Sequence, residues 1–132
     1  MRLEDERARL SRASNPVDRT RIQIRISDLM ISFMGDAAGD NDIERVDARM
    51  EEYRNSILDA HNTMLTSGRD PSSSVAGYQD LEIALRQQIR QLQDINSSLA
   101  FAFRGPVEDL IVEITEIRDE LLDALFPAVD PA

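Results

Sequence analysis

The chain has 132 residues, enough for one domain with a single hydrophobic core. Aromatic residues make up only 5% and Trp is absent, so the core must be mainly aliphatic, which suits packed helices better than a β-sandwich or barrel. Without Cys the chain has no disulfides, thiolate ligands or Cys nucleophiles, and without Lys it has no Schiff-base chemistry. A cysteine-free composition fits a reducing cytoplasm, where we expect this protein.

The net charge of −10 is spread unevenly along the chain. Residues 1–25 contain seven arginines and four acidic residues, a net charge of +3, whereas residues 26–132 have a net charge of −13. An acidic surface argues against nonspecific nucleic-acid binding, which needs a basic face to neutralise phosphates. No apolar run approaches the length of about 18 residues that a membrane span requires. We therefore expect neither nucleic acid nor a membrane as a partner.

Residues 1–14 mix charges with few apolar side chains, which predicts a short, loosely attached helical segment that could fray. Its arginines could form an arm for an acidic partner or lie beside the chain's own acidic helices, and we favour the second interpretation. Asn15 and Pro16 then form a helix start signal, because Asn is a common N-cap and Pro suits the first helical position. A single helical domain is expected over residues 15–127, followed by a tail at 128–132.

The first long helix is predicted over residues 16–34. Residues 21–26 alternate in polarity like a strand, but the apolar positions that follow continue at helical spacing. Two glycines and several acids then predict a turn over residues 35–42. A second helix is predicted over 42–66, with apolar residues at alternating spacings of three and four. Residues 67–77 include Gly, Pro and three consecutive serines, which predicts a mobile connection.

The third helix, predicted over residues 78–104, has the clearest packing pattern in the chain. Its seam again alternates spacings of three and four, and consists of Tyr78, Leu81, Leu85, Gln88, Leu92, Ile95, Leu99 and Ala102. Gly105 and Pro106 predict a sharp stop and a new start. The last helix is predicted over 106–125, and the net charge of −7 over residues 106–132 would suit packing beside the Arg-rich start of the first long helix.

These elements predict an all-α fold, an antiparallel four-helix bundle with the N-terminal segment loosely attached. His61 is the only histidine, so a His pair cannot form within one chain. The residue three before it is Leu58, which excludes the Glu-x-x-His pairs of di-iron bundles. His61 could be a catalytic base or a metal ligand, but we expect a structural, hydrogen-bonded histidine.

Three further polar positions interrupt the apolar stripes. Asp28 and Glu82 lie so close to apolar side chains that each should have a partner. Arg86, one turn after Glu82, is the local candidate, with Arg25 or Arg90 as alternatives. Such ion pairs would fix the order and register of the helices, or line a ligand pocket. Gln88, within the third seam, could select register or oligomeric state, or lie at a cavity.

The sequence contains no recognisable catalytic motif, and we assign no catalytic residue, cofactor or metal ligand. The leading hypothesis is a non-enzymatic interaction or regulatory module that forms homo-oligomers, because the helices are apolar on more than one face. The alternative is a bundle that binds a small molecule or metal, possibly an enzyme, with its site at the polar positions. A third interpretation is binding of a basic partner through the acidic face. The polar positions concerned are Asp28, His61, Glu82, Arg86 and Gln88.

Overall fold

The computed structural model describes residues 2–127, and every regular element in that range is a helix. This confirms the predicted all-α class. The predicted tail at 128–132 lies outside the described residues. The five α-helices and one short 3-10 helix are α1 (Arg2–Arg12), α2 (Pro16–Gly39), α3 (Ile43–Leu65), α4 (Tyr78–Ser98), η1 (Phe101–Phe103) and α5 (Gly105–Leu125).

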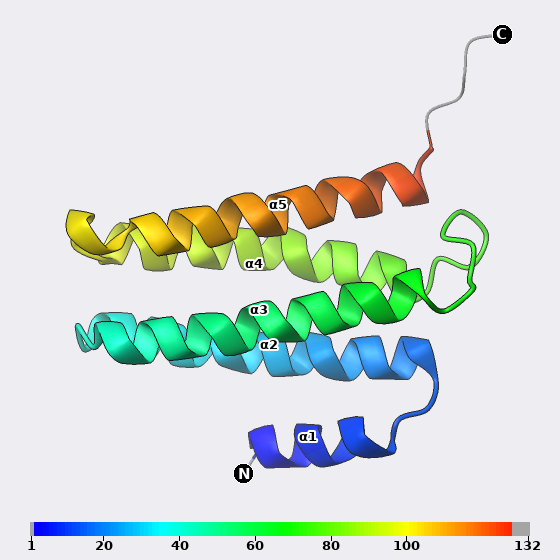
Figure 1. The fold of residues 1–132 in the computed structure, drawn as a ribbon, viewed down its shortest axis with the longest axis horizontal. Helices are drawn as coiled ribbons and strands as arrows, with labels where there is room; N and C mark the ends of the chain where they lie inside the picture. Colours follow the sequence, from blue (N-terminus) through cyan, green and yellow to red (C-terminus); the bar gives the residue numbers. More distant parts are fainter. Residues whose placement is uncertain (1, 128–132) are drawn as a thin grey trace, which may run out of the picture.

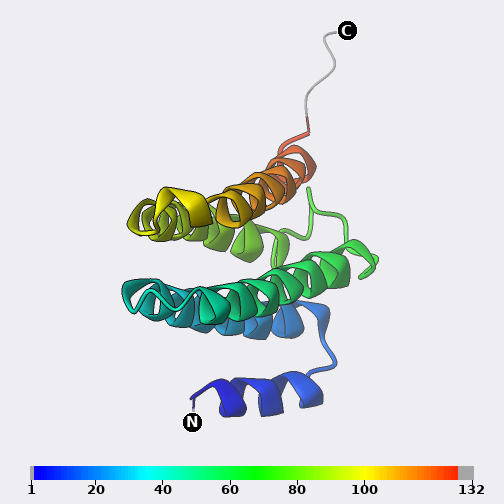
Figure 2. The ribbon, with the colours of Figure 1, turned by 60° about the vertical axis from the view of Figure 1, so that its left-hand side comes forward.

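The helices form three layers, which Figures 1 and 2 show from two sides. Helices α2 and α3 form one hairpin and make the most extensive contact in the chain, and α4 and α5 form a second hairpin. The two hairpins are joined mainly where α2 packs against α4. Helix α1 lies on the far side of α2, so it and α5 are on opposite sides of the molecule (Figure 1).

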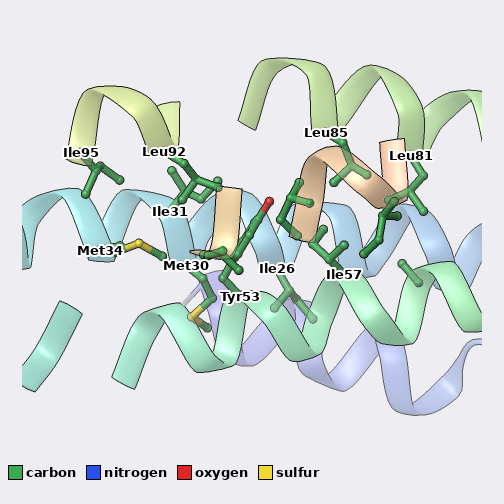
Figure 3. Close-up of a cluster of buried hydrophobic side chains, with 14 of the residues drawn as sticks. Ile26, Met30, Ile31, Met34, Tyr53, Ile57, Leu81, Leu85, Leu92 and Ile95 are labelled. Carbon is green, nitrogen blue, oxygen red and sulfur yellow. The ribbon is translucent and has the colours of Figure 1, made fainter. Parts of the chain in front are cut away.

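The core fills the space between the two hairpins with aliphatic side chains, methionine and two tyrosines, of which Figure 3 labels Tyr53. Met30, Met34, Tyr53 and Ile57 are completely buried, which agrees with the predicted stripes of the first two long helices. Most members of the third and fourth stripes are also buried, but Ala102, the last residue of the predicted third seam, is exposed because α4 ends before it. Their fully or almost fully buried members are Leu81, Leu85, Leu92, Ile114 and Leu121.

Helix α2 begins where the sequence predicts but continues five residues further. The Asn15 side chain accepts a hydrogen bond from the Val17 amide at 2.8 Å, which caps the helix. The predicted end at residue 34 is wrong, because the helix extends to Gly39. Ala37 and Ala38 in this last turn are 0% and 4% exposed, so burial of two good helix formers outweighs the glycines that flank them.

Helix α4 ends at Ser98, six residues before the predicted end at residue 104. The hydroxyl groups of Ser97 and Ser98 donate hydrogen bonds to the carbonyls of Gln93 and Ile95. Serine side chains that bond to nearby carbonyls compete with the helical backbone. Leu99 is then extended and buried, and the Arg104 guanidinium donates to its carbonyl at 2.9 Å. The chain therefore turns through η1 before α5 begins.

Helix α1 is more firmly attached than its composition suggests. Leu3 is 8% exposed and packs into the core, and Glu6 is only 3% exposed. The Glu6 carboxylate accepts hydrogen bonds from Arg9 of the same helix and from Arg25 of α2, both at 3.0 Å. A buried carboxylate with two arginine partners joins α1 to α2, and the expectation of loose attachment did not anticipate it.

The loop over residues 67–77 is also more ordered than predicted. Asp70 accepts hydrogen bonds from the backbone and hydroxyl of Ser72, which closes a turn. The Tyr78 hydroxyl, at the start of α4, donates to the Met64 carbonyl at 2.7 Å and lies 3.0 Å from the Arg69 carbonyl. These contacts hold the loop against the ends of α3 and α4.

Replacement of Gly77 by alanine should destabilise the protein because the backbone passes close to α3 there. Gly77 has φ +85°, and an added Cβ would lie 2.6 Å from Sδ of the fully buried Met64. Positive φ costs a non-glycine residue about 1–2 kcal/mol, and displacement of a packed methionine adds to this. Chemical denaturation should show that Gly77→Ala lowers the free energy of unfolding by about 2 kcal/mol.

Gly68→Ala is the matched control. Gly68 also has positive φ, +77°, but an added Cβ would meet nothing within 4 Å. Its loss should be about 1 kcal/mol, from backbone strain alone. Equal losses in the two variants would contradict the claim that the approach of Gly77 to Met64 matters.

Candidate functional site

Gln88 lies at the centre of a buried hydrogen-bond group between the two hairpins. Its side chain is 0% exposed. Its Oε1 accepts a hydrogen bond from the Tyr53 hydroxyl of α3 at 2.9 Å. Its Nε2 donates to Oγ of Ser27 at 2.7 Å and to Oδ1 of Asp28 at 2.9 Å, both on α2. One amide therefore connects α2, α3 and α4, as expected of a residue that specifies register.

The Tyr53 hydroxyl depends on this arrangement because the tyrosine is completely buried. In Figure 3 its oxygen points from α3 towards α4, where Gln88 lies. Burial, and secondarily the negative charge of Asp28, raises the pKa of Tyr53 well above its ordinary value. The hydroxyl therefore remains a neutral hydrogen-bond donor and cannot act as a base near neutral pH.

Asp28 itself is exposed at the edge of this group. The sequence predicts that Asp28 has a partner, and in the structure this partner is Gln88 and not an arginine. The suggested alternative, Arg25, instead pairs with Glu6 at 3.0 Å. Asp28 also faces an open hollow of about 340 Å³ between α2 and α4, which Arg21, Ile24 and Ile83 help to line.

Glu82 forms a second group, between α4 and α5. The residue is 3% exposed, and its Oε1 pairs with Arg86, which confirms the predicted local partner. Its Oε2 lies 3.2 Å from Nε of both Arg86 and Arg118, the latter on α5. Burial alone would raise the pKa of Glu82, but the hydrogen bonds from the two arginines outweigh it, and the pKa is lowered. The carboxylate therefore stays charged and joins the two helices.

His61 forms a third group, between α3 and α5. It is 8% exposed, and its Nε2 lies 3.7 Å from the Glu120 carboxylate, which is itself largely exposed. Burial lowers the pKa of His61, and the charge of Glu120 opposes this only in part. His61 is therefore neutral near pH 7.

This lowered pKa makes stability depend on pH. The unfolded chain takes up a proton near the ordinary histidine pKa of about 6.5, while folded His61 resists it. The unfolded state then binds more protons, so the free energy of unfolding should fall as the pH decreases from about 7 to about 5.5. Urea denaturation across this window should show a smaller fall in His61→Gln. An equal fall in both proteins would show that other groups cause it.

The structure does not bring the five predicted polar positions into one site. Asp28 and Gln88 belong to one group, Glu82 and Arg86 to another, and His61 lies apart from both. Glu82 and Arg86 do line a hollow of about 400 Å³ with mostly apolar walls, near the start of α4 and the end of α5. Within residues 2–127, no three His, Asp or Glu side chains gather in a way that could hold a metal ion.

The sequence missed the partners that come from other helices. Ser27, Arg118 and Glu120 complete the three groups, and none of them was singled out. Ser27 and Arg118 each come directly after a stripe residue, Ile26 and Ile117, so the sequence does show that both are polar residues beside an apolar face. The helix that each of these side chains contacts depends on how the helices are arranged in space, and the spacing of residues along the sequence does not reveal that arrangement.

None of the helices between residues 2 and 127 combines the length and the apolar character that a membrane span needs. Comparisons with protein-family models, with curated proteins and with solved structures found no match.

Proposed function

We propose that this chain is a non-enzymatic protein–protein interaction or regulatory module that associates with itself. Its frame would be an antiparallel four-helix bundle of α2, α3, α4 and α5, with α1 added outside α2. The alternating directions of consecutive helices in Figure 1 support this description. Its cysteine-free composition suits the cytoplasm, where we propose that it acts.

The observation that carries the proposal is the apolar surface on and around α5. Phe101 is 86% exposed and Phe126 is 72% exposed, at the two ends of this helix. Val112, on the helix itself, is 57% exposed. These three side chains are spread along α5 and do not form one continuous patch, and a partner lying along the helix would cover all three.

The interior polar groups support the same proposal. Gln88 uses its carbonyl and its amide within the chain, and Glu82 is held by two arginines. These contacts suit residues that fix the arrangement of helices. We therefore place the function on the surface and not between the helices.

Sedimentation equilibrium over a wide range of protein concentrations tests this proposal. The weight-average molar mass should rise above the monomer value of 14.9 kDa as concentration increases. A molar mass equal to that of the monomer at every concentration would remove the self-association from the proposal.

The hollow beside Glu82 and Arg86 favours the alternative, a bundle that binds a small molecule. Its walls include Leu122, Leu125 and Phe126, and the Arg86 guanidinium offers a positive charge at its edge. The fluorescent probe anilinonaphthalene sulfonate combines an apolar ring system with one anionic group. Saturable binding of one probe per chain, lost in Arg86→Gln, would support the alternative, and unsaturable binding would count against it.

A further inference from the structure

The start of α2 and the neighbouring α1 enclose a hollow lined by arginines. We define the arginine hollow as the open depression of about 410 Å³ lined by Arg9, Arg12, Arg21 and Arg25. Asp18 is the acidic residue in the same lining. The four guanidinium groups make this depression locally positive, although the chain as a whole has a net charge of −10.

The arginines of this hollow retain hydrogen-bonding capacity. Arg9 and Arg25 each use one nitrogen on Glu6, and Arg21 uses its Nε on Asp80. Arg12 has no ion pair or side-chain hydrogen bond within residues 2–127. A guanidinium carries five N–H donors, so all four side chains can still donate to a carboxylate from outside.

A row of carboxylates lies on the exposed side of α5. We define the acidic stripe as Asp109, Val112, Glu116, Asp119 and Asp123, five exposed residues at alternating spacings of three and four. This spacing places all five on one face of the helix. The four acids have no ion pair within the described chain, and Val112 adds an apolar contact among them.

The two surfaces cannot meet within one molecule. The charge distribution predicts that the acidic last helix packs beside the Arg-rich start of the first long helix, and this prediction is wrong. Arg19 pairs with Asp59 of α3 and Arg21 with Asp80 of α4. Helix α5 packs on α4 and lies on the opposite side of the molecule from α1 (Figures 1 and 2).

We propose that the arginine hollow of one copy binds the acidic stripe of a second copy. This inference rests on the self-association proposed above, and it identifies the two surfaces involved. Because the surfaces differ and lie on opposite sides of the chain, the contact is head to tail, and further copies can add at either end. Charge pairs at such a contact make association weaker at high salt.

Two variants that neutralise one surface each provide the test. The hollow variant is Arg9→Gln with Arg12→Gln, which leaves Arg25 on Glu6. The stripe variant is Asp119→Asn with Asp123→Asn. In analytical ultracentrifugation, each variant alone should associate at least tenfold more weakly than the wild type. An equimolar mixture should form a complex of two chains and no larger species, because each copy keeps one working surface.

Matched controls neutralise charges elsewhere: Arg69→Gln with Arg90→Gln, and Asp36→Asn with Asp94→Asn. These four side chains form no ion pair in the described part of the chain, so the controls should associate like the wild type. Circular dichroism will verify that every variant is folded.

Each alternative result has a definite meaning. If the wild type associates and the hollow or stripe variant associates equally well, the head-to-tail contact is wrong while the proposed self-association stands. The contact is also wrong if the mixture stays monomeric although the wild type associates. If the wild type itself is monomeric throughout, both proposals fail.

Discussion

Removal of both arginines that hold Glu82 is expected to lower the free energy of unfolding by about 3 kcal/mol, the low end of the cost of leaving a buried charge unpaired. The variant is Arg86→Met with Arg118→Met. Glu82 has a side chain only 4% exposed, so its carboxylate would stay in the interior without a partner. Methionine preserves most of the apolar stem of arginine, so the loss reports the missing charge more than lost packing.

The pH dependence distinguishes this mechanism from a simple packing defect. In the wild type the lowered pKa of Glu82 adds stability that is lost as the pH falls through that pKa. Without the arginines, burial should raise the pKa above the ordinary value of about 4.3. The deficit of the variant relative to the wild type should therefore shrink as the pH falls towards about 4.

Two further variants complete the experiment. Addition of Glu82→Met to the double variant should restore most of the lost stability, because a fully apolar group replaces the buried charge. Arg90→Met, an exposed position on the same helix, should change stability by less than about 0.5 kcal/mol. A deficit that is independent of pH, or that Glu82→Met does not relieve, would show that Glu82 is not an unpaired charge in the double variant.

Gln88→Ala is the second large effect, with an expected loss of about 3 kcal/mol from the cavity and the unsatisfied Tyr53 hydroxyl together. Gln88 and Tyr53 are both 0% exposed, so no water can easily replace the missing amide. Gln87→Ala, the neighbouring exposed position, is the control and should cost little. Urea denaturation measures both losses.

A double-mutant cycle isolates the hydrogen bond between Tyr53 and Gln88. In the wild type, Tyr53→Phe should cost about 1.5 kcal/mol, because it leaves Oε1 of Gln88 buried without a donor. In the Gln88→Ala background the same change should be nearly neutral, which gives a coupling energy of about 1.5 kcal/mol. Additive losses would mean that the hydroxyl and the amide act independently.

Much of the fold could be predicted because helical packing patterns are local. The stripes of α2, α3, α4 and α5 repeat at three and four residues, and most of their members are buried or partly buried, Ala102 being an exception. The predicted ends of α2 and α4 were wrong because small residues determine where these helices end. Ala37 and Ala38 extend α2 by burial, and Ser97 and Ser98 help to end α4 through their hydroxyl groups. Neither effect changes the apolar period.

The polar groups were harder to predict because their partners come from distant parts of the chain. Arg86 could be predicted as a partner of Glu82, since four residues separate them on one helix. Arg118 could not, because its contact depends on how α4 and α5 pair. The uneven distribution of charge along the sequence was easy to recognise, but the contact that it predicted between the last helix and the Arg-rich segment does not form. The acidic helix and the Arg-rich segment attract in principle, yet apolar packing places them on opposite sides.

Sedimentation equilibrium of the unmodified protein at low and high salt is the most direct test of the proposed self-association and of the contact between the arginine hollow and the acidic stripe. At low salt the weight-average molar mass should rise above 14.9 kDa with concentration, and at high salt it should fall back towards that value, since salt screens charge pairs. A mass of 14.9 kDa at every concentration and salt level would contradict a self-associating module.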